Sequence, residues 1–140
     1  RYGGLYGPET SLSADGELTA LVRKRRLPVI GDGGGHMSFT HIDDAARAVV
    51  DTLAPGGPTG IFAIVDDEPA TAAEWIPGLA AAIGAGAPRH VPAWVGRLAA
   101  GEVAVTMMTS GRGASNAKAR RELHWTPRWG TWREGFREAL

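Results

Sequence analysis

The stretch Gly60-Ile-Phe-Ala-Ile-Val65 is a nearly continuous apolar run with turn-forming residues on both sides. A strand with one face in water alternates apolar and polar residues. An unbroken apolar run is instead typical of a strand covered on both faces, as in a parallel sheet. The run therefore predicts a buried strand with helices above and below it.

Helix signals stand on both flanks of this run. On its N-terminal side, Asp43 predicts an N-cap for a helix through Leu53, because its carboxylate can accept from the first free N–H groups. On its C-terminal side, Thr71 and Glu74 have the spacing of a capping box that opens a helix ending near Gly84. Strands that alternate with helices favour an α/β fold.

The same alternation extends towards both ends of the chain. The first eight residues predict the end of a strand that enters a loop, and a helix follows the pair Asp15-Gly16. We also expect extended segments over 28–30, 37–42 and 102–109, and helices that start at Pro92, Ser115 and Thr131.

The composition is that of an ordinary globular domain. The 140 residues are 44% hydrophobic and 21% charged, and no stretch approaches the roughly 18 apolar residues of a membrane-spanning helix. Fifteen basic residues balance fifteen acidic ones, which argues against a nucleic-acid or membrane-surface binder held by long-range electrostatics. The absence of cysteine excludes disulfides, thiolate metal ligands and cysteine nucleophiles. We treat residues 1–140 as a single unit. Because the sequence opens on Arg1 without an initiator Met, we expect it to be a piece of a longer protein.

The residues with chemical potential also have plainer explanations. The acidic cluster Asp66-Asp-Glu68 follows the predicted strand, where open α/β sheets bind ligands, but a solvated turn is the favoured interpretation. The Gly31–Gly35 stretch is followed by an extended segment rather than a helix, which favours a turn over a phosphate loop. A metal site is not favoured, because no usable third-ligand spacing accompanies the candidates His36, His41, Asp43 and Asp44. No catalytic residue and no pair of buried carboxylates is assigned.

Four segments are more informative as an ordered set than singly. They are Arg1-Tyr-Gly-Gly-Leu-Tyr-Gly-Pro8, Ser38-Phe-Thr-His-Ile-Asp-Asp-Ala-Ala46, Ile64-Val-Asp-Asp-Glu-Pro69 and Ser115-Asn-Ala-Lys-Ala-Arg-Arg-Glu-Leu-x-Trp125. In order and approximate spacing, the set resembles the NAD-dependent epimerase/dehydratase family, the extended short-chain dehydrogenases. The resemblance implies a C-terminal, substrate-binding portion of a Rossmann-like fold, with few strands and flanking helices. Such a portion is incomplete without the N-terminal dinucleotide domain.

In that family, the N-terminal domain binds NAD or NADP and carries a Tyr-x-x-x-Lys pair, which this chain lacks. The resemblance implies that Tyr2 and Gly3 pass the nicotinamide. It also implies that the substrate is contacted by Gly4, Tyr6, Met37 and Phe39. Arg112 is a further candidate substrate contact, a cation on another loop whose spacing does not match a family position.

Two of these positions depart from the family pattern. Sugar-nucleotide members often carry Asn where this chain has Gly4, and commonly carry an Arg that pairs with the substrate diphosphate where it has Met37. Both departures predict a smaller, less charged, non-nucleotide substrate.

Two functions remain open at this point. One is the substrate-binding part of an NAD(P)-dependent epimerase/dehydratase or reductase-like enzyme. The other is a non-catalytic ligand-sensing or protein-interaction module derived from the same fold. In either case we expect a cytoplasmic protein with a small-molecule ligand and without nucleic-acid or membrane partners. We also expect homo-oligomers to form if the dinucleotide half is absent, because its removal uncovers apolar strand faces.

Overall fold

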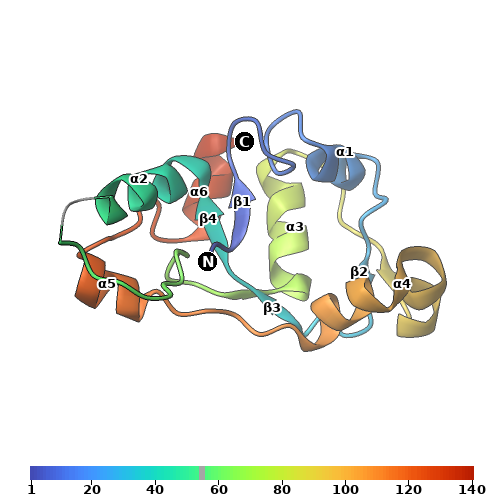
Figure 1. Cartoon of the computed structure of the whole chain (residues 1–140). Helices are drawn as coiled ribbons and strands as arrows, with labels where there is room; N and C mark the ends of the chain where they lie inside the picture. The colour runs from blue at the N-terminus through green and yellow to red at the C-terminus, as the bar shows by residue number, and fades with distance from the viewer. Residues whose placement is uncertain (54–55) are drawn as a thin grey trace.

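Three short strand pairs run through the middle of the computed structural model, which describes residues 1–53 and 56–140 (Figure 1). The parallel pairs are β1 (Gly4–Tyr6) with β4 (Phe39–His41), and β2 (Val29–Ile30) with β6 (His90–Val91). The antiparallel pair is β3 (His36–Met37) with β5 (Ala70–Thr71). In the first pair, Gly4 lies opposite Phe39 and Tyr6 opposite His41. The chain between these two strands forms a crossover that contains a helix, as parallel pairing requires.

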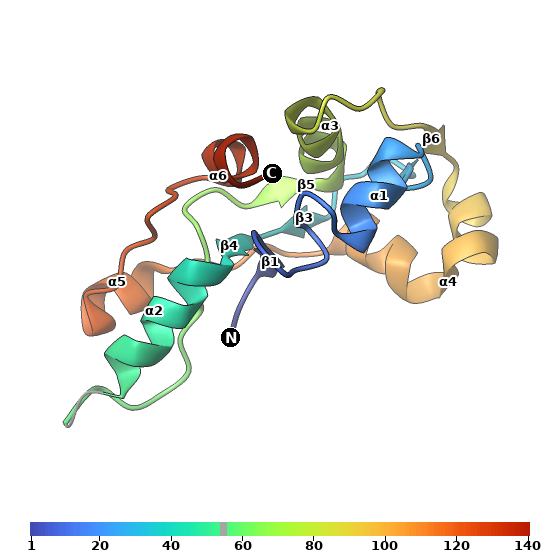
Figure 2. The same cartoon turned by 90° about the horizontal axis from the view of Figure 1, so that it is seen from above.

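Six helices among the described residues surround these strands. They are α1 (Glu17–Arg23), α2 (Ile42–Thr52), α3 (Ala72–Ala82), α4 (Ala93–Ser110), α5 (Ala117–Leu123) and α6 (Trp132–Ala139). Figure 2 shows α3 and α6 together on one side of the strands, with α2 and α5 side by side at one end and α4 at the other. This arrangement confirms the α/β class. No helix in the described part of the chain has the length and apolarity needed to cross a membrane.

The larger hydrophobic cluster, called the central core here, lies between β1, β4, α3 and α6. Its middle is a set of interlocking aromatic rings, with Phe39 5.3 Å from Phe136 and 5.5 Å from Trp75, both edge to face. Trp132 and Phe136 stand one turn apart on α6 and are both about 1% exposed. The expected amphipathic C-terminal helix is thus confirmed, and it closes one side of the core.

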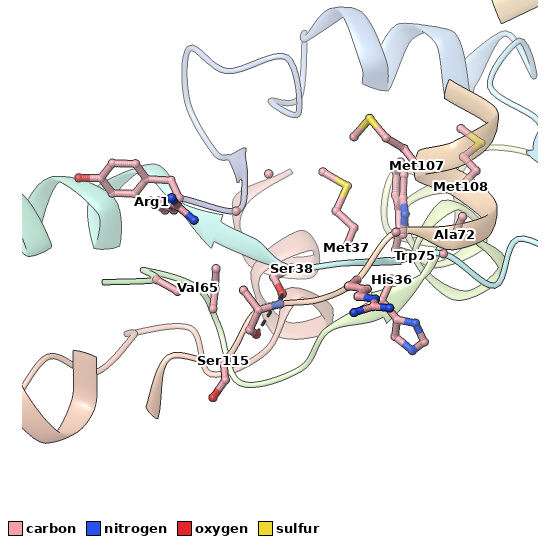
Figure 3. A pocket seen from close by; sticks show the side chains of 18 of the residues that line it. Arg1, His36, Met37, Ser38, Val65, Ala72, Trp75, Met107, Met108 and Ser115 are labelled. Atoms are coloured by element: carbon pink, nitrogen blue, oxygen red, sulfur yellow. Dashed lines mark hydrogen bonds between the residues drawn. The ribbon is translucent and has the colours of Figure 1, made fainter. Parts of the chain in front are cut away.

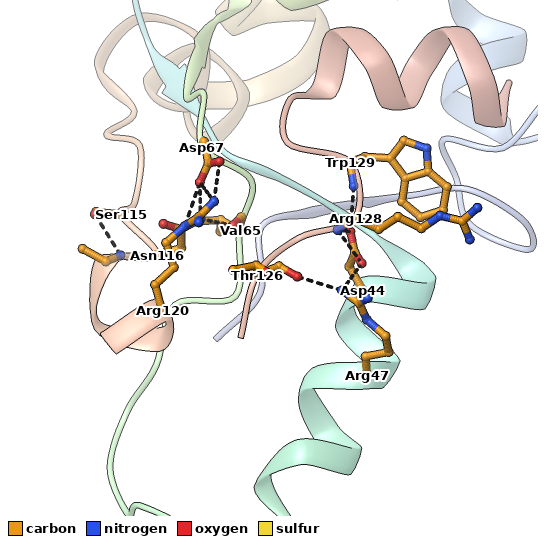
Figure 4. Close-up of polar contacts among 11 residues, drawn as sticks. Asp44, Arg47, Val65, Asp67, Ser115, Asn116, Arg120, Thr126, Arg128 and Trp129 are labelled. Carbon is orange, nitrogen blue, oxygen red and sulfur yellow. Dashed lines mark hydrogen bonds and ion pairs between the residues drawn. The ribbon is translucent and has the colours of Figure 1, made fainter. Parts of the chain in front are cut away.

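A smaller cluster, called the α2/α5 cluster here, is formed by buried residues of α2, α5 and the segments around them: Ala48, Phe62, Ile64, Ala119 and Trp125. Polar contacts hold it (Figure 4). The buried Asp44 carboxylate accepts from the backbone N–H of Arg128 at 2.9 Å and from the Arg47 guanidinium at 2.7 Å. Asp67 pairs with Arg120 and accepts from the Asn116 side chain at 2.7 Å.

The strand expected over residues 60–65 does not form. Only Ile64 makes a bridge, in parallel with Tyr2, and its N–H donates to the Arg1 carbonyl at 2.8 Å. Phe62, Ile64 and Val65 are buried, but Ile61 is 63% exposed. The apolar pattern therefore predicted burial correctly, whereas a strand also needs neighbours along its length, and this segment has them at one point.

The extended segment expected over 102–109 is a helix. Residues 93–110 form α4, which changes direction at Gly101, where φ is +83°. The expected helix start at Pro92 is correct, but the helix is longer than predicted. The β-branched residues of 103–109 suggested a strand, yet Val105 is buried at helical spacing from Met108, so tertiary packing overrides local preference.

Helix caps follow the sequence signals at α3 and α6 but not at α2 and α5. At α5 the N-cap position is Asn116 rather than the expected Ser115, and the Asn116 side chain makes no capping hydrogen bond to a described residue. Thr71 and Glu74 form the expected capping box, and the Thr131 hydroxyl accepts from the Glu134 N–H at 3.3 Å. The prediction that Asp43 caps α2 is wrong. The helix begins at Ile42, and Nδ1 of His41 accepts from the Asp43 N–H at 3.2 Å. A buried imidazole thus provides the cap, and burial lowers the pKa of His41, which keeps Nδ1 an acceptor.

Candidate functional site

A cavity of about 890 Å³ lies between the opening strand and the second half of α4 (Figure 3). One wall is the segment Arg1–Gly4, and the opposite wall is the end of α4 with Ala104, Met107 and Met108. The segments Gly35–Ser38 and Gly111–Ser115 lie between these walls. The side chain of Trp75, from α3, reaches the cavity from the core. Most of the lining is apolar side chain or glycine backbone.

Gly4 and Met37 share one space in this cavity. A Cβ atom added at Gly4 would overlap the terminal methyl group of Met37, and its next neighbours would be ring atoms of Phe39. Met37 therefore fills the volume that a side chain at position 4 would occupy. The two departures from the sugar-nucleotide pattern are thus one structural feature, an apolar floor.

Arg112 projects from a short loop that is tightly fastened to β3. The His36 N–H donates to the Gly111 carbonyl at 2.8 Å, and the Ala114 N–H donates to the Ser38 hydroxyl at 2.9 Å. Side chains at Gly111 or Gly113 would overlap the Met107 carbonyl or the Pro69 ring. Arg112 is therefore the only residue of this Gly-Arg-Gly turn that presents a side chain, and it lines the cavity.

The cations around the cavity differ in how they are engaged. Lys118 contacts the Ile61 carbonyl at 3.3 Å, lies 4.6 Å from the Phe62 ring centroid and is 3.9 Å from Glu122. The guanidinium of Arg112 makes no ion pair or hydrogen bond with any described residue. It is the more available of these two charges.

The site residues named from the sequence divide into two groups. Tyr2 and Gly3, expected beside the cofactor, line the cavity, as do three expected substrate contacts: Gly4, Met37 and Arg112. The other two, Tyr6 and Phe39, do not line it. Both have essentially no exposed surface and pack in the central core.

Sequence reasoning missed two features of this region. Met107 and Met108 were not named, because their segment was expected to be extended. Asp66 was assigned to a solvated turn, but it is 2% exposed, and together with Asp44 it makes two buried carboxylates where none was expected. Its position directly after a buried apolar run was the available signal. Asp67 and Glu68 do face outward, in ion pairs with Arg120 and Arg133.

Burial sets the protonation of two groups beneath the site. It raises the pKa of the Asp66 carboxyl to about 7, against the opposing effect of nearby backbone amides, and neither oxygen has a hydrogen bond of good geometry in the described residues. Burial, with a smaller contribution from Asp66, also raises the pKa of the Tyr6 hydroxyl well above its ordinary value. Tyr6 therefore keeps its proton and takes a structural part. No cluster of three or more metal-ligating side chains occurs among the described residues.

The chain was compared with known protein families, sequences and solved structures. No family model matches the chain. A 3-diazoavenalumate denitrifying reductase from Streptomyces is 41% identical over 136 residues, which is 97% of this chain and 44% of the reductase. A human epimerase family protein, SDR39U1, solved with NADPH, superimposes with a TM-score of 0.80 at 22% identity over 99% of this chain and 46% of its own. UDP-glucose 4-epimerase from Thermotoga maritima, solved with UDP-glucose, superimposes with a TM-score of 0.69 at 22% identity. The match covers 99% of this chain and 43% of the epimerase.

The chain thus spans a little less than half the length of these proteins. It has the fold of part of an extended short-chain dehydrogenase, the NAD-dependent epimerase/dehydratase fold, which confirms the resemblance found in the sequence. Structural neighbours were solved with NADPH or NAD. The sequence relative is named as a reductase.

Proposed function

We propose that this chain is the C-terminal, substrate-binding part of an NAD(P)-dependent reductase- or epimerase-like enzyme. Its substrate is a small, largely apolar molecule rather than a nucleotide-diphosphate sugar. The observation that carries the proposal is the cavity of about 890 Å³ with its floor of Gly4 and Met37. The rest of the enzyme supplies the dinucleotide site and the proton-transferring Tyr-x-x-x-Lys pair.

The lining of the cavity supports the substrate class. A diphosphate needs charge-assisted partners, each of which contributes about 1.5–3 kcal/mol. Met37 stands where the sugar-nucleotide enzymes commonly place such an arginine, and its methyl group leaves no room for a polar side chain at Gly4. An apolar ligand instead gains by covering Met37, Met107 and Trp75, at roughly 25 cal/mol for each Å² removed from water.

The opening segment supports the cofactor assignment. Tyr2 and Gly3 lie on the cavity wall, and Tyr2 is 49% exposed in this chain, so its ring is free to cover the nicotinamide of NAD or NADP. The nicotinamide ring would then face the substrate across Gly4. The 41% identical reductase, whose named substrate is 3-diazoavenalumate rather than a sugar nucleotide, favours reduction.

Two binding measurements test this function. The protein that includes the region upstream of Arg1 is titrated with NADPH and NADH by calorimetry, beside the 140-residue chain. We expect micromolar affinity for one cofactor in the longer protein and none in the chain alone. Loss of cofactor binding by the longer protein, with no Tyr-x-x-x-Lys pair in its sequence, would support the non-catalytic module instead.

The substrate class is tested with the cofactor-loaded protein and two probes, the neutral apolar cinnamamide and UDP-glucose. We expect cinnamamide to bind and UDP-glucose not to bind. Met37→Arg should weaken cinnamamide, and the exposed Leu98→Arg, which places the same charge away from the cavity, should leave it unchanged. Tighter binding of UDP-glucose than of cinnamamide to the unmodified protein would overturn the proposal.

A further inference from the structure

All three methionines of the protein line the same cavity. Met37 comes from β3, and Met107 and Met108 from the last two turns of α4, so two separate elements bring the three thioethers together (Figure 3). A thioether is polarisable and makes favourable contacts with aromatic rings, most often at the ring edge. Unbranched methionine side chains also adapt to the outline of a flat ligand. The three methionines in one cavity therefore favour a ligand with a planar aromatic ring.

Arg112 belongs to the methionine end of the cavity. It follows α4 within two residues of its end. The Gly35 N–H donates to the Met108 carbonyl and the His36 N–H donates to the Gly111 carbonyl, both at 2.8 Å, so this loop lies against the end of α4. Arg1 lies at the end of the cavity away from Met107 and Met108 in Figure 3. A guanidinium is a planar fork of donors that matches a carboxylate with two parallel hydrogen bonds. Because the turn fixes its backbone and no described residue pairs with its guanidinium, Arg112 is available as a carboxylate partner at the edge of an apolar cavity.

We propose that the ligand of this cavity is an aromatic monocarboxylate, with its ring among Met37, Met107 and Met108 and its carboxylate paired with Arg112. This inference rests on the proposed function, because it takes the cavity as the substrate site. It adds the charge of the substrate and the direction in which the substrate lies. The carboxylate is at the α4 end, and the rest of the molecule extends past Gly4 towards Tyr2 and the cofactor.

The test compares cinnamate with its neutral amide, cinnamamide, in binding to the cofactor-loaded full-length protein. The two probes share the ring and differ in charge. We expect cinnamate to bind about tenfold more tightly, the lower end for a charge-assisted pair because Arg112 is exposed. Arg112→Gln should remove this preference and leave cinnamamide unchanged. Arg112→Lys should keep part of the preference, because it retains the charge but loses the fork.

Arg26→Gln is the matched control. Arg26 is an exposed arginine that does not line the cavity, so the substitution makes the same change of charge elsewhere. It should leave the tenfold preference intact. Because Arg112 has no partner among the described residues, Arg112→Gln should also keep the melting temperature of the Arg26→Gln variant, which excludes misfolding as the cause of a loss.

The outcomes separate the inference from the proposed function. Equal binding of cinnamate and cinnamamide, or a preference that survives Arg112→Gln, overturns the carboxylate assignment while the proposed function stands. A preference abolished by Arg1→Gln but not by Arg112→Gln overturns the orientation. Failure of both probes to bind overturns the ligand class. Tighter binding of UDP-glucose than of either probe overturns the proposed function itself.

Discussion

The central core and the α2/α5 cluster are stabilised in different ways. Thirteen buried residues form the central core, and its aromatic rings meet edge to face, whereas five form the α2/α5 cluster. Around the smaller cluster, Val50, Leu53 and Ile61 are 63–76% exposed. Charged hydrogen bonds from Asp44 and Asp67 hold its segments together.

The two regions also differ in whether the described residues cover their apolar surfaces. The central core carries its own covering helices, α3 and α6. The α2/α5 cluster and the cavity share the exposed opening segment around Tyr2 and Ile61, whose outer side has no covering layer in the described residues. Large-to-small changes should therefore cost most in the central core, and changes of charge should cost most in the α2/α5 cluster.

Phe136→Ala should give the largest effect. Phe136 is 1% exposed and contacts the rings of Phe39, Tyr6 and Trp132. Removal of a buried ring costs about 3–5 kcal/mol of unfolding free energy through lost burial and the cavity left behind. Urea denaturation measures the loss. Leu98→Ala, at a side chain 82% exposed, is the control and should change the unfolding free energy by less than about 0.5 kcal/mol. Equal costs would show that the central core is not the stabilising unit.

Asp66, where the two regions meet, should make stability depend on pH. Its folded pKa of about 7 lies above the unfolded value of 3.8, so the folded state binds more protons between these two values. The contribution of Asp66 to the unfolding free energy should therefore be greatest below about pH 4, fall by about 4 kcal/mol as pH rises to about 7, and level off above that. Denaturation at pH 5 and pH 8 measures the fall. Asp66→Asn should flatten it, while Asp67→Asn should keep it, and an unchanged slope in Asp66→Asn would contradict the assignment.

Asp44→Asn should destabilise the protein by about 2 kcal/mol, because it replaces a buried acceptor of three groups with an amide that cannot accept from all of them. The adjacent Asp43 is the matched control, since its side chain is 69% exposed and Asp43→Asn removes the same charge. We expect the control to cost less than about 0.5 kcal/mol. Thermal unfolding of both variants distinguishes the loss of the hydrogen bonds to the buried Asp44 carboxylate from a general effect of charge on α2.

Arg120→Gln should give the smallest effect. The pair of Arg120 with Asp67 is about 40% exposed on both sides, so solvent screens it and its loss should cost less than about 1 kcal/mol. Added salt should reduce the difference between the variant and the parent protein further. Arg121→Gln, whose partner Glu122 is its neighbour in sequence, should cost nothing measurable in the same experiment. A large, salt-independent loss of unfolding free energy in Arg120→Gln would show that the Arg120–Asp67 pair stabilises the protein as much as the contacts of Asp44 do.

Local signals in the sequence predicted the fold where one element contains its own evidence. The Thr71 capping box and the Trp132–Phe136 spacing are such cases. The prediction of an extended segment over 102–109 was wrong. Valines and threonines favour strands locally, whereas the packing of Val105 decides that these residues are helical. The apolar run at 60–65 shows the opposite limit, since it reports burial and not whether a partner strand lies alongside.

The candidate site was found only in part for the same reason. Gly4 and Met37 occupy positions that the family resemblance marks, and Arg112 was named from its charge alone; all three line the cavity. Met107 and Met108 became visible only once α4 was known to be a helix that turns back over β3. Asp66 was hidden because three acidic residues follow one another, and the sequence does not show which of them points inward.

The change of direction at Gly101 divides α4 into a segment that packs on β2 and a segment that lines the cavity. The first segment packs on β2, where Gly96 lies against Ile30, and the second carries Met107 and Met108 over the cavity. Because the helical hydrogen bonding is interrupted between them, sequence changes after Gly101 should reshape the cavity wall without disturbing the packing before it. The part of α4 that packs on β2 is thereby uncoupled from the part that lines the cavity.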